Sequence, residues 1–191
     1  LDVDMSLRLL PGVAIAAITA SPYRVERTHE QTIDGNDDFV LTIVRQAGVA
    51  GGQAGRGAEL QAGEAFLFHN DGRMTAVAPI GARVINVAVP KGLIVPVVKD
   101  IDAVLKDKLP RSMPLALLAS YAEGLMADIP LTPEAGRMAG SHMRDLIVAV
   151  MNAQPEALEE TSSRGVQAAR LADIKHDIAE NLADPGLSLD A

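Results

Sequence analysis

The pattern of hydrophobic and polar positions changes near residue 110. Before that point, short apolar runs rich in β-branched residues alternate with breaks that contain glycine, which is typical of strands in an antiparallel sandwich or small barrel. These runs cover residues 13–18, 39–44, 65–69, 74–77 and 84–89. The tract from Gly48 to Gly57 contains five glycines and predicts a turn or a flexible hairpin loop.

After residue 110 the apolar residues recur at helical spacing. Ser112 with Pro114, and Thr132 with Pro133, are typical helix starts, because a hydroxyl caps the first turn and proline is tolerated there. A third helical series ends before a strong breaker and consists of Leu171, Ile174, Ile178 and Leu182. The chain therefore predicts an α+β protein, in which helices pack on one side of a sheet or extend from it.

Charge narrows the range of partners. The 191 residues carry a net charge of -8, from 17 basic and 25 acidic side chains. Residues 111–191 hold 6 basic and 12 acidic residues, so the helical part contributes most of the negative charge. A DNA-binding surface needs clustered Lys and Arg to displace counterions from phosphates. These residues are therefore not expected to contact DNA.

The cysteine content and the lengths of the apolar runs indicate the cellular compartment. The chain contains no cysteine, which excludes disulfides and thiolate metal sites and fits a reducing cytoplasm, the location that we expect. No apolar run reaches the roughly 18 residues that span a bilayer, so no membrane partner is expected. Residues 1–8 carry two aspartates and do not have the pattern of a signal peptide.

Three segments carry motifs that occur together in one family. Residues 57–68 have the form G-x-x-L-x-x-G-(D/E), in which Leu60 anchors a strand and Gly63 permits a tight turn. Val89-Pro90-Lys91 ends the last apolar strand, and residues 170–190 end in the motif D-P-x-L-S-L. The first segment resembles the turn of cupin-type β-barrels. All three together resemble AraC/XylS-type transcriptional regulators, in which the last segment opens the DNA-binding domain.

The resemblance implies a division of the chain. It implies a cupin-like antiparallel β-barrel or sandwich for effector sensing over residues 1–110, linker and dimerisation helices over 111–165, and the start of a DNA-binding domain over 166–191. Both helix-turn-helix units of the family are missing from this sequence. The chain begins with Leu1 and ends at Ala191, two residues after the D-P-x-L-S-L motif, so we expect it to be part of a longer regulator. Promoter DNA would then bind only through the missing domain.

Candidate catalytic chemistry is sparse. Metal-binding cupins resemble one another in a G-x5-H-x-H pattern, whereas the four histidines here stand far apart, at positions 29, 69, 142 and 176. His29 and His69 could meet in the barrel, although their spacing does not require it. No nucleophile motif or phosphate-binding loop occurs. We therefore expect no metal, no cofactor and no enzyme. The alternatives are a cupin-like isomerase or oxygenase, and a dimerisation module that binds no ligand.

Polar residues within the apolar strands are the candidates for orienting an effector inside the barrel. Thr42 and Asn86 each lie among aliphatic residues, and Phe68 and His69 end the 65–69 run. If Arg45 faces solvent, strand alternation points Thr42 inward. Each polar residue could equally be a hydrogen-bonded core group or a turn residue. The chain has only five aromatic residues, which favours a small aliphatic or polar effector over a flat aromatic one, or no effector at all.

The 133–153 helix carries the candidate dimer surface. Its apolar and methionine-rich stripe includes Met138, His142, Leu146 and Val150. Methionine adapts to irregular contacts, so the stripe could pack on the barrel as plain core or pair with its copy in a second subunit. The family resemblance favours a two-fold homodimer through these helices.

Overall fold

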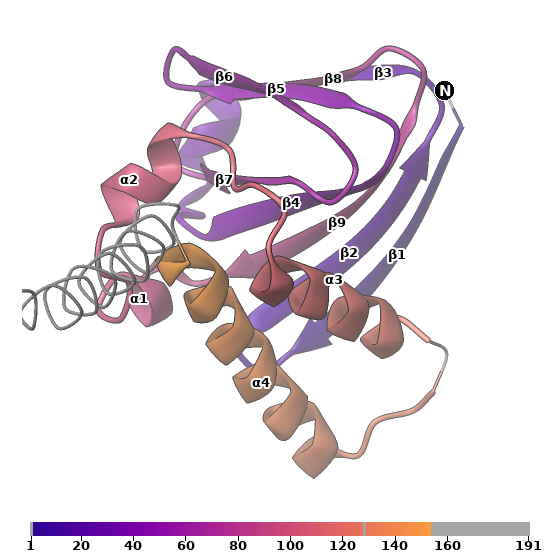
Figure 1. Cartoon of the computed structure of the whole chain (residues 1–191), viewed down its shortest axis with the longest axis vertical. Helices are drawn as coiled ribbons and strands as arrows, with labels where there is room; N and C mark the ends of the chain where they lie inside the picture. Colours follow the sequence, from indigo (N-terminus) through magenta and orange to yellow (C-terminus); the bar gives the residue numbers. More distant parts are fainter. Residues whose placement is uncertain (1, 128, 154–191) are drawn as a thin grey trace, which may run out of the picture. The chain divides into compact units, whose positions relative to one another are not determined.

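The computed structural model describes residues 2–127 and 129–153, and within these residues it places nine strands ahead of the two longer helices (Figure 1). The strands are β1 Val3–Leu10, β2 Val13–Ala20, β3 Tyr23–Arg27, β4 Phe39–Gln46, β5 Val49–Gln53, β6 Arg56–Leu60, β7 Ala65–His69, β8 Met74–Ala78 and β9 Ala82–Val89. The helices are the 3-10 turn η1 Glu30–Asp34, then α1 Lys91–Ile94, α2 Ile101–Lys106, α3 Met113–Leu125 and α4 Pro133–Asn152.

The strands form two antiparallel sheets. One sheet has the order β1-β2-β9-β4-β7, and the other has the order β3-β8-β5-β6. The predicted α+β class is therefore confirmed. Of the two predicted forms, barrel and sandwich, the described strands form a sandwich, because each sheet keeps its own set of hydrogen-bonded strands.

The helices α3 and α4 cover the outer face of the five-stranded sheet (Figure 1). Alternate residues of β4 and β9 point to opposite faces, so Leu41 and Ile85 pack against the helices while Val44 and Val84 pack against the second sheet. Both faces of these central strands are thus buried. This explains why their sequences are nearly continuous apolar runs, without the polar alternation of a half-exposed strand.

Both predicted helix starts are confirmed. The Ser112 hydroxyl accepts a hydrogen bond from the Leu115 backbone nitrogen at 3.4 Å, and the Thr132 hydroxyl accepts one from Ala135 at 3.2 Å. Each cap satisfies a backbone N–H that has no partner within its own helix. The predicted third helix at 171–182 and the motif at 170–190 lie outside the described residues.

The glycine-rich tract is more ordered than the sequence suggested. Its residues form the paired strands β5 and β6, joined by a tight turn at Ala54-Gly55. Both turn residues have positive φ, at 55° and 78°, which is the geometry of a two-residue hairpin that follows the twist of its strands. The predicted hairpin turn is therefore confirmed, and its glycine-rich flanks form strands that were not predicted.

An ion pair joins the start of β7 to the segment after α2. Lys108 Nζ lies 2.9 Å from both carboxylate oxygens of Glu64, whose side chain is largely buried. Glu64 also caps its own turn, where the backbone nitrogen of Gln61 donates to the carboxylate at 2.9 Å. Burial works against ionisation here, but these hydrogen bonds and the Lys108 charge outweigh it and lower the pKa of Glu64.

Candidate effector site

A cavity of about 360 Å³ lies between the two sheets. Most of its lining is aliphatic or aromatic, from strands of both sheets, and includes Ile18, Leu60, Phe68, Met74 and Val84. A ligand pocket of this kind commonly combines an apolar wall with a few fixed polar groups. The polar side chains in this lining are those of Tyr23, Arg24, Thr42 and Asn86.

Thr42 and Asn86 form the polar centre of the cavity floor. The register of β4 and β9 places the two residues directly opposite each other, and the Thr42 hydroxyl donates to Asn86 Oδ1 at 2.9 Å. Both side chains point into the cavity because Thr42 shares its face with Val44, and Asn86 shares its face with Val84.

The hydrogen bond leaves part of the Asn86 amide unused. Among the described residues, the Asn86 side-chain nitrogen, which carries two N–H donors, forms no hydrogen bond. A polar group without a partner in an apolar site favours any ligand that supplies the missing acceptor. The cavity is therefore suited to a mainly apolar molecule with a carbonyl, ether or hydroxyl oxygen.

Phe68 forms one wall, and a glycine makes room for it. A Cβ atom added at Gly51 would lie 3.3 Å from Phe68 Cζ, so even alanine would crowd the ring. Both residues line the cavity. The ring of Phe66 lies beside that of Phe68, with centroids 4.7 Å apart. The glycines of the hairpin, which the sequence indicated only as loop-forming, thus set the position of an aromatic wall.

Tyr23 adds a polar group that was not among the predicted site residues. It lies in β3, faces the cavity and is half-buried, and burial raises the pKa of its phenol. β3 was not among the predicted strands, because Tyr23-Arg24-Val25-Glu26-Arg27 has only two apolar positions. Their alternation with charged residues was the signal that could have identified it.

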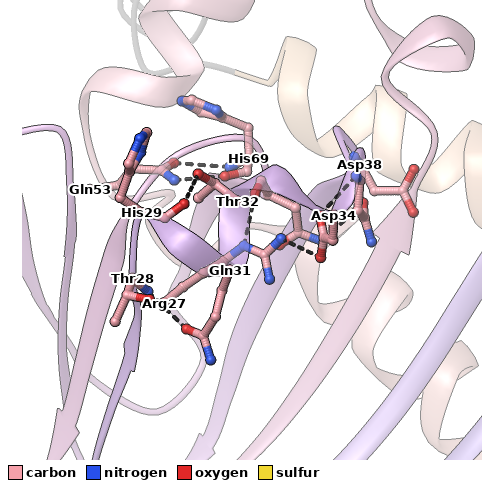
Figure 2. A network of polar contacts seen from close by, with 11 residues as sticks. Arg27, Thr28, His29, Gln31, Thr32, Asp34, Asp38, Gln53 and His69 are labelled. Atoms are coloured by element: carbon pink, nitrogen blue, oxygen red, sulfur yellow. Dashed lines mark hydrogen bonds and ion pairs between the residues drawn. The ribbon is translucent and has the colours of Figure 1, made fainter.

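His69 lies on the opposite face of β7 from Phe68 and does not line the cavity. Its ring contacts Asp71, and burial together with the charges of Lys91 and Arg56 lowers its pKa. Its backbone is held by Gln53, whose buried amide accepts from His69 N at 2.9 Å and donates to His69 O at 2.6 Å (Figure 2). The Gln53 side chain thus makes the two hydrogen bonds to the His69 backbone that a neighbouring strand would make, and it connects β5 of one sheet to β7 of the other.

Further polar contacts surround the same end of the sandwich. Arg27 donates to Asp34 at 2.7 Å, and Thr32 donates to the His29 carbonyl at 2.7 Å (Figure 2). Arg27 also donates to the Asn70 carbonyl at 2.8 Å. The hydrogen bond from Arg27 lowers the pKa of Asp34. His29 and His69 belong to this polar network. In the part of the chain that the structure describes, no three His, Asp or Glu side chains are arranged to hold a metal ion.

The strands under the cavity also contact the helices. Arg45 lies on the outer face of β4 and holds Glu123 of α3 with two hydrogen bonds of 3.0 and 3.1 Å. Arg83 of β9 reaches the same carboxylate at 3.3 Å. Thr42 points inward as expected, but Arg45 is paired with a helix instead of facing solvent. β4 and β9 thus carry cavity residues on one face and helix contacts on the other.

The candidate dimer residues divide between surface and core. Met138 is 58% exposed, and His142 is exposed with its ring nitrogen 3.2 Å from the Tyr121 hydroxyl. Leu146 is partly buried against the core, and Val150 is within it. Only the first half of the stripe is therefore free to contact a second subunit.

No helix among the described residues is long and apolar enough to cross a membrane.

Comparison with solved structures supports the resemblance at the level of the fold. The chain superposes on the AraC-like transcriptional activator CuxR with a TM-score of 0.69 and 18% sequence identity, over 80% of this chain and 56% of CuxR. It therefore spans little more than half of that activator. The α+β sandwich followed by helices is the fold that CuxR shares with this chain, as the sequence motifs implied.

Other solved structures overlap with a smaller part of the chain. A cupin superfamily protein from Desulfitobacterium hafniense has a TM-score of 0.39 and 10% identity, over 46% of this chain and 77% of its own. KdgF from a Halomonas species has a TM-score of 0.38 and 17% identity, over 47% of this chain and 79% of its own. No family model matches the sequence, and no curated protein matches it.

Proposed function

We propose that this chain is the effector-sensing and dimerisation part of an AraC-type transcription regulator, which acts through a helix-turn-helix domain outside these residues. The observation that carries the proposal is the cavity with the Thr42–Asn86 pair at its centre. A module that only dimerises would need no such space, and a packed interior would serve it better. The likeness to CuxR supports a regulatory role for the fold.

The effector would be a small, mainly apolar molecule that carries an oxygen acceptor. Its acceptor would bind the free N–H of Asn86, and its carbon skeleton would fill the space between Phe68 and the aliphatic wall. A charged group would bind less well at this point, because the deep lining offers it no counter-charge. Arg24 lies among the lining residues but is exposed and belongs to the edge strand β3.

Signal transfer would use the two faces of β4 and β9. A ligand that moves the cavity face of these strands also moves Arg45 and Arg83, and with them Glu123 and α3. A ligand shifts such an equilibrium only by the difference in its affinity for the two states. The exposed part of the helical surface, around Met138 and His142, would report the shift by changing contacts with a second subunit.

The proposal is tested by titrating the chain with methyl hexyl ketone and with octane, which has the chain but no acceptor. NMR of the isotope-labelled protein follows the side-chain amide resonances of Asn86 directly. We expect the ketone to shift these resonances and to bind more tightly than octane. Binding of neither compound, together with a cavity that excludes every small acceptor tried, would sink the sensing role.

A further inference from the structure

The first strand presents an unpaired edge and an apolar face at the same time. β1 lies at the end of the five-stranded sheet and, among the described residues, pairs only with β2 (Figure 1). Its alternate residues Val3, Met5, Leu7 and Leu9 form one row and are between 51% and 73% exposed. The strand contains no proline or bulge, and the charges of Asp4 and Arg8 are its only devices against edge pairing.

The backbone of this edge is set for a partner strand. The Asp2 carbonyl accepts a hydrogen bond from Ser21 N at 2.9 Å, so the backbone polar groups of residue 2 point toward β2. Because backbone direction alternates along an antiparallel pair, Val3, Met5, Leu7 and Leu9 direct their N–H and C=O groups outward. These are also the residues with exposed apolar side chains.

The charges of β1 are complementary to those of a second copy of β1 that runs antiparallel to it. Asp4, Ser6 and Arg8 occupy the other face, so a two-fold axis beside Ser6 would place Asp4 of each strand opposite Arg8 of its copy. The same register sets Met5 opposite Leu7 and Val3 opposite Leu9. In this register nearly the whole of β1 pairs with its copy, and each Asp4 faces Arg8 of the other strand.

Neither charge has an ionic partner within the described part of the chain. Asp4 is exposed and forms no ion pair there. Arg8 donates to the carbonyls of Ala127 and Ile129 at 2.8 and 3.2 Å, two uncharged acceptors that fix its side chain. A row of exposed apolar residues, an edge and two charges, the edge and the charges without partners among the described residues, therefore coincide on one strand.

We propose that β1 pairs antiparallel with β1 of a second copy of this chain, about a two-fold axis beside Ser6. The pairing joins the two five-stranded sheets into one continuous sheet across the dimer. It buries the edge backbone and forms two symmetric Asp4–Arg8 ion pairs. The surface is distinct from the α4 surface around Met138 and needs no effector, so its failure would leave cavity binding unaffected.

The test uses charge reversal with complementation. Asp4→Arg or Arg8→Asp alone places like charges opposite each other, and each should raise the dimer dissociation constant by about tenfold or more. Mixing the two variants restores both unlike pairs, so the mixture should form heterodimers at concentrations where each variant is a monomer. Analytical ultracentrifugation measures all three samples. Asp37→Arg, an equal charge change on an exposed loop, is the matched control.

A cysteine variant checks the axis itself. The chain has no cysteine, so Ser6→Cys introduces a single thiol. Facing residues at this type of position have Cα atoms about 4.5 Å apart, which permits a disulfide. Ser6→Cys should cross-link on mild oxidation, and Asp37→Cys should not. A monomeric wild-type chain overturns the proposal. So does a dimer that tolerates Asp4→Arg, fails to cross-link at Ser6 and dissociates with Met138→Asp.

Discussion

The Thr42 hydroxyl lies 2.9 Å from Asn86 Oδ1, across a strand pair whose register places the two residues face to face. The pair is the polar centre of an otherwise apolar cavity floor. Because Thr42 occupies the amide oxygen, the amide keeps its two N–H groups for a ligand. In the proposed effector site, specificity for an oxygen acceptor would thus depend on two residues far apart in sequence.

Replacing Asn86 should separate the contribution of its hydrogen bond to ligand binding from the contribution of apolar contacts in the cavity. Asn86→Leu removes both donors, so we expect methyl hexyl ketone to bind about tenfold more weakly, while octane binds as well or better. Thr42→Val is the matched control, since it retains the Asn86 donors and should cost the ketone less affinity. Isothermal titration calorimetry measures both ligands. Equal losses for ketone and octane would show that Asn86 acts only through packing.

Filling the cavity from the hairpin should weaken binding without unfolding the chain. Gly51→Ala places a methyl group 3.3 Å from Phe68 Cζ and reduces the ligand space. We expect weaker ketone binding and a free energy of unfolding within about 1 kcal/mol of wild type, since alanine suits a strand better than glycine. Gly57→Ala, on the facing strand, meets only a carbonyl at 3.6 Å and should leave binding unchanged.

The connection between sheet and helix should contribute to stability. Arg45→Met removes two hydrogen bonds to Glu123, and we expect the free energy of unfolding in urea to fall by about 1–3 kcal/mol. Arg83→Met removes a single longer contact from a more exposed side chain and should cost less than 1 kcal/mol, about the value of a surface pair. Equal effects of the two variants would contradict a special role for the Arg45 pair.

Acid should weaken the fold through Glu64. Its pKa is lowered in the folded chain, so its contribution to stability is complete above the unfolded value near 4.5 and is lost as pH falls through the folded value. We expect Glu64→Gln to be less stable than wild type at neutral pH, and the difference to shrink below pH 4.5. Urea unfolding at a series of pH values measures it. A difference that does not depend on pH would rule out the ion pair as its cause.

Much of this fold could be predicted from the sequence, because the buried strands are long apolar runs and the helices carry clear caps. β1 is not among the predicted strands, because residues 1–8 were weighed only as a signal peptide, from their aspartates. The alternation of Val3, Met5, Leu7 and Leu9 was the signal that could have identified it. The short helices α1 and α2 fall inside the part that was expected to be wholly β. Their few residues hold too little periodicity to be distinguished from a loop.

The residues of the candidate site could be predicted only where the alternation of side chains along a strand decides which of them point into the cavity. Thr42, Phe68 and Asn86 all line the cavity, since each shares a strand face with other residues of the inner core. His69 follows Phe68 directly, and the same alternation turns it away from the cavity. The contribution of Gly51 and the Arg45–Glu123 pair depend on contacts between distant segments, which no local pattern contains.

The β5–β6 hairpin has a consequence for how such a protein could change its ligand. At Gly51 the cavity wall is backbone, and a Cβ introduced there would lie at the cavity wall, 3.3 Å from the ring of Phe68. A single codon change at this position could therefore alter which molecules fit, while the sheets and helices that form the rest of the fold keep their contacts. Most other lining residues, such as Leu60 and Val84, also belong to the core, so Gly51 is a position where the cavity could change with little change to the rest of the fold.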